Sequence, residues 1–198
     1  MFNTDFIGVY DNALTSYQCK EIIKWTETQS LVKGKVLEDN QIKEKLEDKD
    51  DWEVDATKTN FQNKTFVDLM IRDALFKSIG LYRKSHPEIG HITPWDLYDD
   101  FNIQKYNPGE CYHALHCENA GGSDIMRVMA WMIYLNTVTD KGGTYFSSYN
   151  RTIKPKEGRL VIWPAYFTHY HRGVVSKTQT KYIATGWYNF TNVLLLQA

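Results

Sequence analysis

Residues 100–118 read DFNIQKYNPGECYHALHCE. The first seven residues form a short aromatic and β-branched run that favours a strand, and the NPGE after them is typical of a turn. The stretch ends on His116 and Glu118, which are two positions apart. Side chains at positions i and i+2 of a strand point to the same face, so an imidazole and a carboxylate would converge here. Taken alone, the stretch fits a metal site, a thiol site or a polar turn.

More runs of this kind follow the first one. They are VMAWMIYLN (128–136), RLVIWP (159–164) and KYIATGWYNF (181–190). Turn sequences such as DKGG and KPKEG separate them, which predicts a series of short antiparallel strands.

Helical patterns precede the strands. LTSYQCKEIIKW (14–25) offers Ser16 as an N-cap, and FVDLMIRDALFKSIGLY (66–82) repeats apolar residues with a 3.6-residue period. The charge-dense segment between them, residues 32–55, is expected to be a solvated loop with a short helix, or alternatively a lid or substrate loop. The last residues, NVLLLQA (192–198), predict a final strand or a packed tail.

Helices first and strands after them indicate an α+β fold, in which helices buttress an antiparallel sheet or a double-sheet jelly roll. We expect a single domain over residues 1–198. Residues 1–98 would form a mainly helical N-terminal support, and residues 99–190 would form the jelly-roll core.

Composition narrows the classes of partner. Hydrophobic residues make up 42% of the chain and aromatic residues 14%, which suits a β-rich core filled by wide side chains. The formal net charge of -1 favours neither nucleic acid nor acidic lipid, and we expect no such partner. Three cysteines indicate a reducing compartment. With no signal peptide or membrane-spanning run in view, a cytoplasmic location is expected.

Histidines supply the strongest chemical signal. FTHYHRG places His169 and His171 two apart, downstream of His116 and Glu118. Two imidazoles and one carboxylate on one face of a metal form the facial triad of non-heme Fe(II) oxygenases, which leaves three positions open. Lys181 follows ten residues after His171 inside an apolar strand, where an unpaired ammonium is costly. A carboxylate of a small dicarboxylate ligand would supply its partner.

Several segments together resemble a known family. YNPGECYHALHCE, WMIYLN, KGGTYF, IKPKEGRLVIWP, HYHRG and KYIATGW are similar to the 2-oxoglutarate/Fe(II)-dependent dioxygenases, and especially to short bacterial and phage members of the prolyl 4-hydroxylase-like branch. The resemblance covers roughly residues 99–190, and the opening VYDNALTSYQCKEII is also similar. It implies a core with the double-stranded β-helix (jelly-roll, cupin-like) fold. It also implies a protein of the bacterial cytoplasm or, if a phage encodes it, of the host-cell cytoplasm.

The resemblance also implies roles for single residues. His116, Glu118 and His171 would be the iron ligands, Lys181 would bind the distal carboxylate of 2-oxoglutarate, and the hydroxyl of Tyr106 would reach the cosubstrate. The family usually has Asp at the position of Glu118, although a glutamate can still ligate. The loop with a GGxT pattern matches Gly142, Gly143 and Thr144, without the usual glutamate before the threonine, and Gly158 matches the turn before the strand that leads to the distal histidine.

The activity implied is hydroxylation of an unactivated C–H bond with Fe(II), 2-oxoglutarate and O2, ascorbate serving as a reductant and succinate and CO2 being released. A prolyl or other side chain of a peptide is the expected substrate, and a small molecule stays open. Substrate choice would lie in residues 31–60, 86–98 and 119–126. Two alternatives remain, a non-catalytic metal- or ligand-binding jelly roll and a cupin-type metal enzyme that does not use 2-oxoglutarate. Lys181 discriminates against the cupin-type enzyme, because that chemistry gives the lysine no task, and a bound metal other than iron without succinate formation would support the non-catalytic module.

Other polar and aromatic residues of this region receive weaker interpretations. We expect His113 and His169 to be outer-sphere, substrate-facing or structural residues, Cys117 to pack on the opposite face, and Cys111 to lie near the pocket mouth. Arg127 is expected either in the substrate cleft or at a solvated strand end. Core packing is expected, with a pocket wall as the rival, for Trp163, Tyr166, Trp187 and Tyr188.

Overall fold

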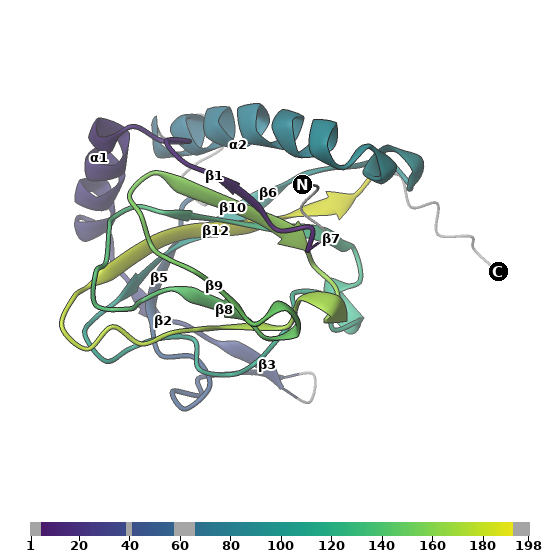
Figure 1. Cartoon of the computed structure of the whole chain (residues 1–198). Coiled ribbons are helices and arrows are strands. Elements are labelled where there is room, and N and C mark those ends of the chain that lie inside the picture. The colour runs from purple at the N-terminus through teal and green to yellow at the C-terminus, as the bar shows by residue number, and fades with distance from the viewer. Residues whose placement is uncertain (1–4, 39–40, 58–65, 192–198) are drawn as a thin grey trace.

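The computed structural model describes residues 5–38, 41–57 and 66–191, so the predicted C-terminal strand or tail, NVLLLQA, lies outside the described residues. The helices are α1 (Ser16–Glu27) and α2 (Phe66–Ser85). Figure 1 shows α2 above the larger sheet, α1 at its left end, and the strands β8 (Thr144–Phe146) and β9 (Arg151–Ile153) of the smaller sheet below it. The α+β class expected from the sequence is confirmed.

The larger sheet has seven strands in an antiparallel arrangement. Their order is β1 (Gly8–Tyr10), β10 (Arg159–Pro164), β7 (Arg127–Tyr134), β12 (Lys181–Phe190), β6 (Trp95–Tyr106), β5 (Trp52–Asp55) and β2 (Val32–Lys33).

The smaller sheet has three strands, in the order β11 (His171–Gly173), β8 (Thr144–Phe146) and β9 (Arg151–Ile153). A separate hairpin joins β3 (Val36–Glu38) and β4 (Gln41–Lys43). Short 3-10 helices are η1 (Pro87–His91), η2 (Gly122–Asp124), η3 (Ser147–Tyr149) and η4 (Phe167–His169).

Two layers of core fill the space around the larger sheet. The helices bury Cys19 and Ile22 of α1 and Ile71 and Leu75 of α2 in one cluster with residues of the sheet such as Trp131. The opposite face of the sheet contributes to a second cluster, which includes Met132, Tyr134, Phe146, Val161 and Trp163. Alternate residues of β7 and β10 therefore serve the two clusters, as the period of two in a strand requires.

The predicted elements agree closely with the observed ones in the apolar runs. β10 and β12 match the predicted strands, and α2 matches the periodic segment with an extension of three residues. β6 begins at Trp95, five residues before the predicted strand. The N-cap of α1 was assigned wrongly: Thr15, not Ser16, caps it, and Thr15 forms a reciprocal capping box with Gln18.

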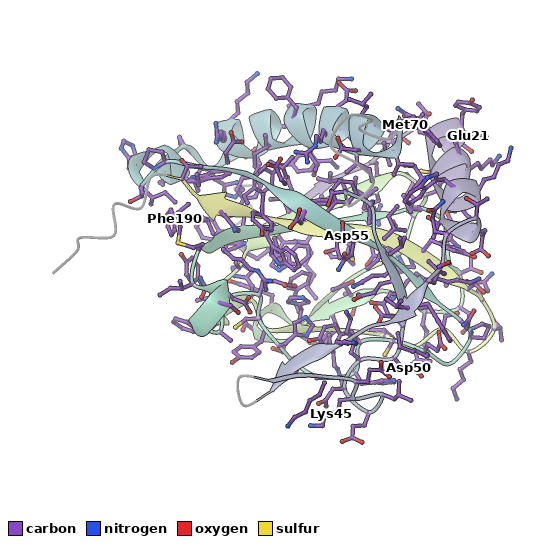
Figure 2. The ribbon with its side chains drawn as sticks, turned by 180° about the vertical axis from the view of Figure 1, so that it is seen from behind. Glu21, Lys45, Asp50, Asp55, Met70 and Phe190 are labelled. Atoms are coloured by element: carbon purple, nitrogen blue, oxygen red, sulfur yellow. The ribbon has the colours of Figure 1, made fainter. Side chains whose placement is uncertain are left out.

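The charged segment 32–55 is where the sequence interpretation was wrong, because it contains strands rather than a loop with a short helix. β5 extends the sheet at β6, with Trp52 opposite Lys105 and Val54 opposite Ile103. Figure 2 views the chain from this side, with Asp50 and Asp55 labelled before and at the end of β5. Together with β1 and β2, this strand makes the N-terminal part a structural component of the sheet as well as a helical support.

Gly158 shapes the turn that leads into β10. Its φ is +73°, and a Cβ atom there would lie 2.2 Å from the carbonyl oxygen of Leu14. The carbonyl of Gly158 also accepts the backbone N–H of Ala13, which ties the start of α1 to this turn. Both constraints require glycine at this position.

No helix in the described part of the chain is long and apolar enough to cross a membrane.

We expect Gly158→Ala to lower the free energy of unfolding by about 1–3 kcal/mol, because it combines a strained φ with a backbone clash. The matched control is Gly80→Ala in α2, where a Cβ meets nothing within 4 Å. This second change should raise stability by about 0.5–1 kcal/mol. Urea unfolding midpoints measure the change in stability of both variants. Equal effects of the two substitutions would contradict the conclusion that the turn requires glycine at position 158.

Candidate active site

A cavity of about 690 Å³ opens between the two sheets. Strands of the larger sheet line it with Gln104, Met132, Lys181 and Ile183, and the smaller sheet adds Thr144 and His171. The segment after β6 completes the wall with Tyr112, His116 and Glu118, and Arg127 adds to it from the start of β7. The cavity thus collects residues that are far apart in the sequence.

His116, Glu118 and His171 come together in this cavity. Glu118 Oε1 lies 3.7 Å from His116 Nε2 and 3.3 Å from His171 Nε2. One potential ligand atom from each residue lies within 4.8 Å of the other two, the arrangement that a single metal ion needs. Among the described residues, no other group of three or more His, Cys, Asp or Glu side chains meets this criterion.

The strand expected through His116 and Glu118 is reduced to one isolated bridge. His116 and His171 exchange two backbone hydrogen bonds, at 3.0 Å and 2.8 Å. A pair that exchanges both bonds is the hydrogen-bonded pair of an antiparallel ladder, whose Cα atoms lie about 5.5 Å apart. It places the two imidazoles 4.4 Å apart between ring centroids, so the backbone of two distant segments sets the geometry of the cluster.

Both imidazoles present Nε2 to the cluster. His116 Nδ1 donates to Ala114 O and His171 Nδ1 donates to His169 O, at 2.9 Å in each case. Because a backbone carbonyl can only accept a hydrogen bond, each ring carries a proton on Nδ1. In each neutral ring Nε2 then keeps its lone pair, whereas a protonated ring can donate from Nε2 to Glu118 Oε1. Tyr112 also stacks on His116 with ring centroids 3.8 Å apart, which restricts rotation of that ring.

The protonation states suit metal binding. Burial opposes the charge on Glu118, but hydrogen bonding and charge from His116 and His171 outweigh it and hold the pKa of Glu118 well below its usual range. Burial and the neighbouring His116 lower the pKa of His171. An ionised carboxylate and a neutral imidazole are the forms that bind a metal ion. Two nitrogens and one oxygen are also the donor set of non-heme iron sites, so the residues fit Fe(II).

Lys181 lies in the same cavity with only 5% of its surface exposed. Its register position is opposite Tyr106, and its ammonium sits 4.2 Å from the centre of the Tyr106 ring. No residue in the described ranges forms a hydrogen bond or ion pair with this ammonium. Burial lowers the pKa of Lys181 to about 8, although the charges of Cys111 and Asp51 offset part of that effect. A buried cation of this kind fits an incoming carboxylate.

The hydroxyl of Tyr106 has a protein partner. It donates to Gln104 Oε1 at 2.8 Å, and the amide of Gln104 lies 3.4 Å from Glu53 Oε2. The same Glu53 oxygen accepts from Lys49 at 2.7 Å. This row of polar groups lines one wall of the cavity, and the sequence interpretation missed Lys49 and Glu53 because they lie in the charged segment assigned to a loop.

The remaining predicted residues divide into two groups. His113 and His169 lie outside the cluster: His113 Nδ1 contacts Cys111 Sγ at 3.2 Å, and His169 Nε2 contacts Asp5 O at 2.8 Å. Arg127 lines the cavity rather than a solvated strand end. Residues that also line the cavity are Cys117, Trp163 and Trp187, whereas Tyr188 packs in the core and Tyr166 is 36% exposed.

Comparison with known proteins agrees with this geometry. The family model described as the 2OG-Fe(II) oxygenase superfamily matches residues 101–189, which include all three cluster residues and Lys181. Residues 101–189 of this chain are therefore similar to the 2OG-Fe(II) oxygenase superfamily. A mimivirus protein from Acanthamoeba polyphaga mimivirus, provisionally named as a prolyl 4-hydroxylase, is 30% identical over 116 residues. That match covers 48% of this chain and 47% of the relative, so the chain spans about half of that relative's length.

Solved structures show the same fold. A viral collagen prolyl hydroxylase from Paramecium Bursaria Chlorella virus-1, in its 2OG complex, has a TM-score of 0.73 at 17% identity, covering 96% of this chain and 99% of that one. A prolyl hydroxylase from Trichoplax adhaerens, in complex with a hypoxia inducible factor peptide fragment, has a TM-score of 0.69 at 16% identity, covering 95% and 85%. The expected double-stranded β-helix is thereby confirmed as the fold of the core.

Affinity for 2-oxoglutarate should fall as pH rises through about 8, because the buried Lys181 loses its proton there and the cosubstrate loses its cationic partner. Below this pH the ammonium is charged and affinity is at its maximum. The decline is at most about tenfold per pH unit, since one proton is involved. Binding to the Mn(II)-loaded protein, measured by calorimetry between pH 6.5 and 9.5, gives the profile.

Lys181→Arg is the matched control for this profile, because a guanidinium stays protonated throughout the range. Its affinity should show no decline that begins near pH 8. If the parent and the arginine variant lose affinity in parallel, the titrating group is elsewhere and the assignment of Lys181 is wrong.

Proposed function

We propose that this chain is an Fe(II)- and 2-oxoglutarate-dependent dioxygenase that hydroxylates an unactivated C–H bond in a peptide substrate, with prolyl residues as the first candidates. The observation that carries the proposal is the presence, in one cavity, of a His–Glu–His cluster and a buried lysine without an acidic partner among the described residues. The cluster accounts for the metal and the lysine accounts for the dicarboxylate.

His116, Glu118 and His171 would hold Fe(II), and Lys181 would hold the distal carboxylate of 2-oxoglutarate. When bound, iron and cosubstrate supply the oxidising chemistry, in which O2 is reduced, 2-oxoglutarate becomes succinate and CO2, and a hydroxyl group is added to the substrate. The protein's part is to fix positions and to exclude water. Apolar side chains such as Met132, Trp163 and Ile183 form the walls that do so.

Tyr106 has two tasks in this proposal. Its ring lies beneath the Lys181 ammonium and stabilises the cation before the cosubstrate arrives. Its hydroxyl hydrogen is engaged with Gln104, which leaves the oxygen only as an acceptor in this arrangement. Reaching a carboxylate of the cosubstrate would require the hydroxyl to turn from Gln104.

Support for a prolyl substrate comes from two directions. The solved relatives named above are described as prolyl hydroxylases, one of them with a bound peptide fragment. The aromatic side chains of Tyr112 and Trp187 line the cavity next to the cluster, and they supply apolar surface on which a pyrrolidine ring can pack. The substrate of this chain is inferred from that combination.

The competing functions account for fewer of the observed residues. A non-catalytic jelly-roll module or a zinc enzyme of the cupin type would use the cluster but would give the buried Lys181 no task. Both alternatives leave that ammonium without a carboxylate that binds it directly, and the Tyr106 ring is then its main stabilising contact.

The test is turnover with peptides. Protein reconstituted with Fe(II), 2-oxoglutarate and ascorbate should form succinate in step with one oxygen atom added to a proline-containing peptide, measured by mass spectrometry. The same peptide with alanine in place of proline should not be modified. His171→Ala should abolish both products, because it removes a metal ligand. Peptide-dependent succinate that persists in His171→Ala would contradict the proposed site.

A further inference from the structure

The candidate ligands are each held in place by a second contact. Each imidazole donates through Nδ1 to the backbone carbonyl two residues before it, at 2.9 Å in both cases. Glu118 has an equivalent contact, because its Oε2 accepts a hydrogen bond from Trp187 Nε1 at 2.8 Å. Of these three hydrogen bonds, only the one from Trp187 to Glu118 comes from another side chain. A substitution can therefore remove it.

The two oxygens of Glu118 face different partners. Oε1 lies 3.7 Å and 3.3 Å from the Nε2 atoms of His116 and His171, whereas Oε2 is taken by the indole N–H of Trp187. A carboxylate held in this way presents one oxygen to a metal ion. One-oxygen ligation by the glutamate leaves three metal positions open, as 2-oxoglutarate and O2 require.

The position of Trp187 follows from the alternation of side chains along β12. Trp187 pairs with Ala130 on β7, but the register with β6 shifts between Gly186 and Tyr188, so Trp187 has no partner residue on β6. Lys181, Ile183 and Thr185 also line the cavity, so Trp187 keeps the period of two on this face of β12 despite the register shift. Here the indole is directed into the cavity, where it meets Glu118.

Arg127 fixes the indole from its other side. Its guanidinium lies 3.8 Å from the centre of the Trp187 ring, in cation–π geometry. Nη1 donates to the backbone carbonyl of Glu118 at 3.0 Å, and Nη2 pairs with Asp124 at 3.1 Å. The backbone and the carboxylate of Glu118 are therefore both tied to the Arg127–Trp187 stack.

We propose that Trp187 is a positioning residue that allows glutamate to serve as the carboxylate ligand, by holding Oε2 so that only Oε1 faces the metal. The inference rests on the proposed function. A glutamate is one methylene longer than an aspartate, by about 1.5 Å, and has one more rotatable bond to restrain. The indole N–H supplies that restraint, and Arg127 holds the indole.

Trp187→Phe tests the proposal because it keeps the aromatic ring and removes the N–H. Calorimetric affinity for Mn(II), a redox-stable probe, should fall about 10–100-fold, the usual cost of losing an outer-sphere partner of a ligand. Trp131→Phe is the matched control. Its buried indole N–H has no hydrogen-bond partner in the described part of the chain, and its side chain packs in the helix-side cluster. Mn(II) affinity should be unchanged in this variant.

A double-mutant cycle separates positioning from space filling. Glu118→Asp shortens the carboxylate, so its contact with Trp187 is lost whether or not the indole N–H is present. Trp187→Phe should then weaken Mn(II) binding in the parent and add little in the Glu118→Asp background. Equal losses in both backgrounds would overturn the proposal, because Trp187 would then act only through its bulk.

The NMR resonance of the Trp187 indole N–H tests the contact with Glu118 in the parent protein and in Glu118→Asp. The indole N–H proton of Trp187, identified among six tryptophans by its loss in Trp187→Phe or by selective labelling, should lie downfield in the metal-free protein and move upfield in Glu118→Asp. A resonance that does not respond to Glu118→Asp would overturn the contact.

The outcomes distinguish this inference from the proposed function. If the parent binds Mn(II), His171→Ala does not, and Trp187→Phe binds as tightly as the parent, the metal site stands and the role of Trp187 is wrong. If the parent and His171→Ala bind Mn(II) alike, the metal site itself is wrong and the positioning role falls with it.

Discussion

The pair of backbone hydrogen bonds between His116 and His171 is the constraint on which the site depends. It joins the segment that leaves β6 to the first residue of β11, and thereby ties the larger sheet to the smaller one. Because backbone groups form the bridge, the separation of the two imidazoles is set by the fold. Glu118 then needs only to turn one oxygen toward both Nε2 atoms, and Trp187 holds the other oxygen.

Electrostatics within the cavity follow from the same architecture. Lys181 begins β12 opposite Tyr106, so the strand register places its ammonium at a fixed depth in the cavity wall. The cost of burying that charge is expressed in a pKa lowered to about 8. A carboxylate ligand would relieve this cost, which is a physical reason for a dicarboxylate rather than a neutral cosubstrate. In the proposed function, the His–Glu–His cluster and Lys181 would be the two ends of one binding site in this cavity.

The sequence predicts the strands and the site residues well in the segments where apolar residues recur with a clear period. β10 and β12 were predicted with their observed bounds, and His116, Glu118 and His171 were singled out from spacing and family resemblance. The charged segment 32–55 could not be read, because Glu53 and Asp55 alternate with Trp52 and Val54 in a strand whose polar face borders a cavity rather than solvent. Trp187 was missed as a partner of Glu118 because the two residues are 69 positions apart, and no local sequence signal connects them.

The central claim is that one cavity binds Fe(II) and 2-oxoglutarate together, and anaerobic titration followed by visible absorption tests it most directly. Chelation of a 2-oxo acid to ferrous iron produces a weak charge-transfer band that neither component shows alone. The account predicts that this band appears when 2-oxoglutarate is added to the Fe(II)-loaded protein, and that Lys181→Ala requires far more cosubstrate to reach it. Absence of the band at saturating Fe(II) and 2-oxoglutarate, in protein that remains folded, would contradict the account.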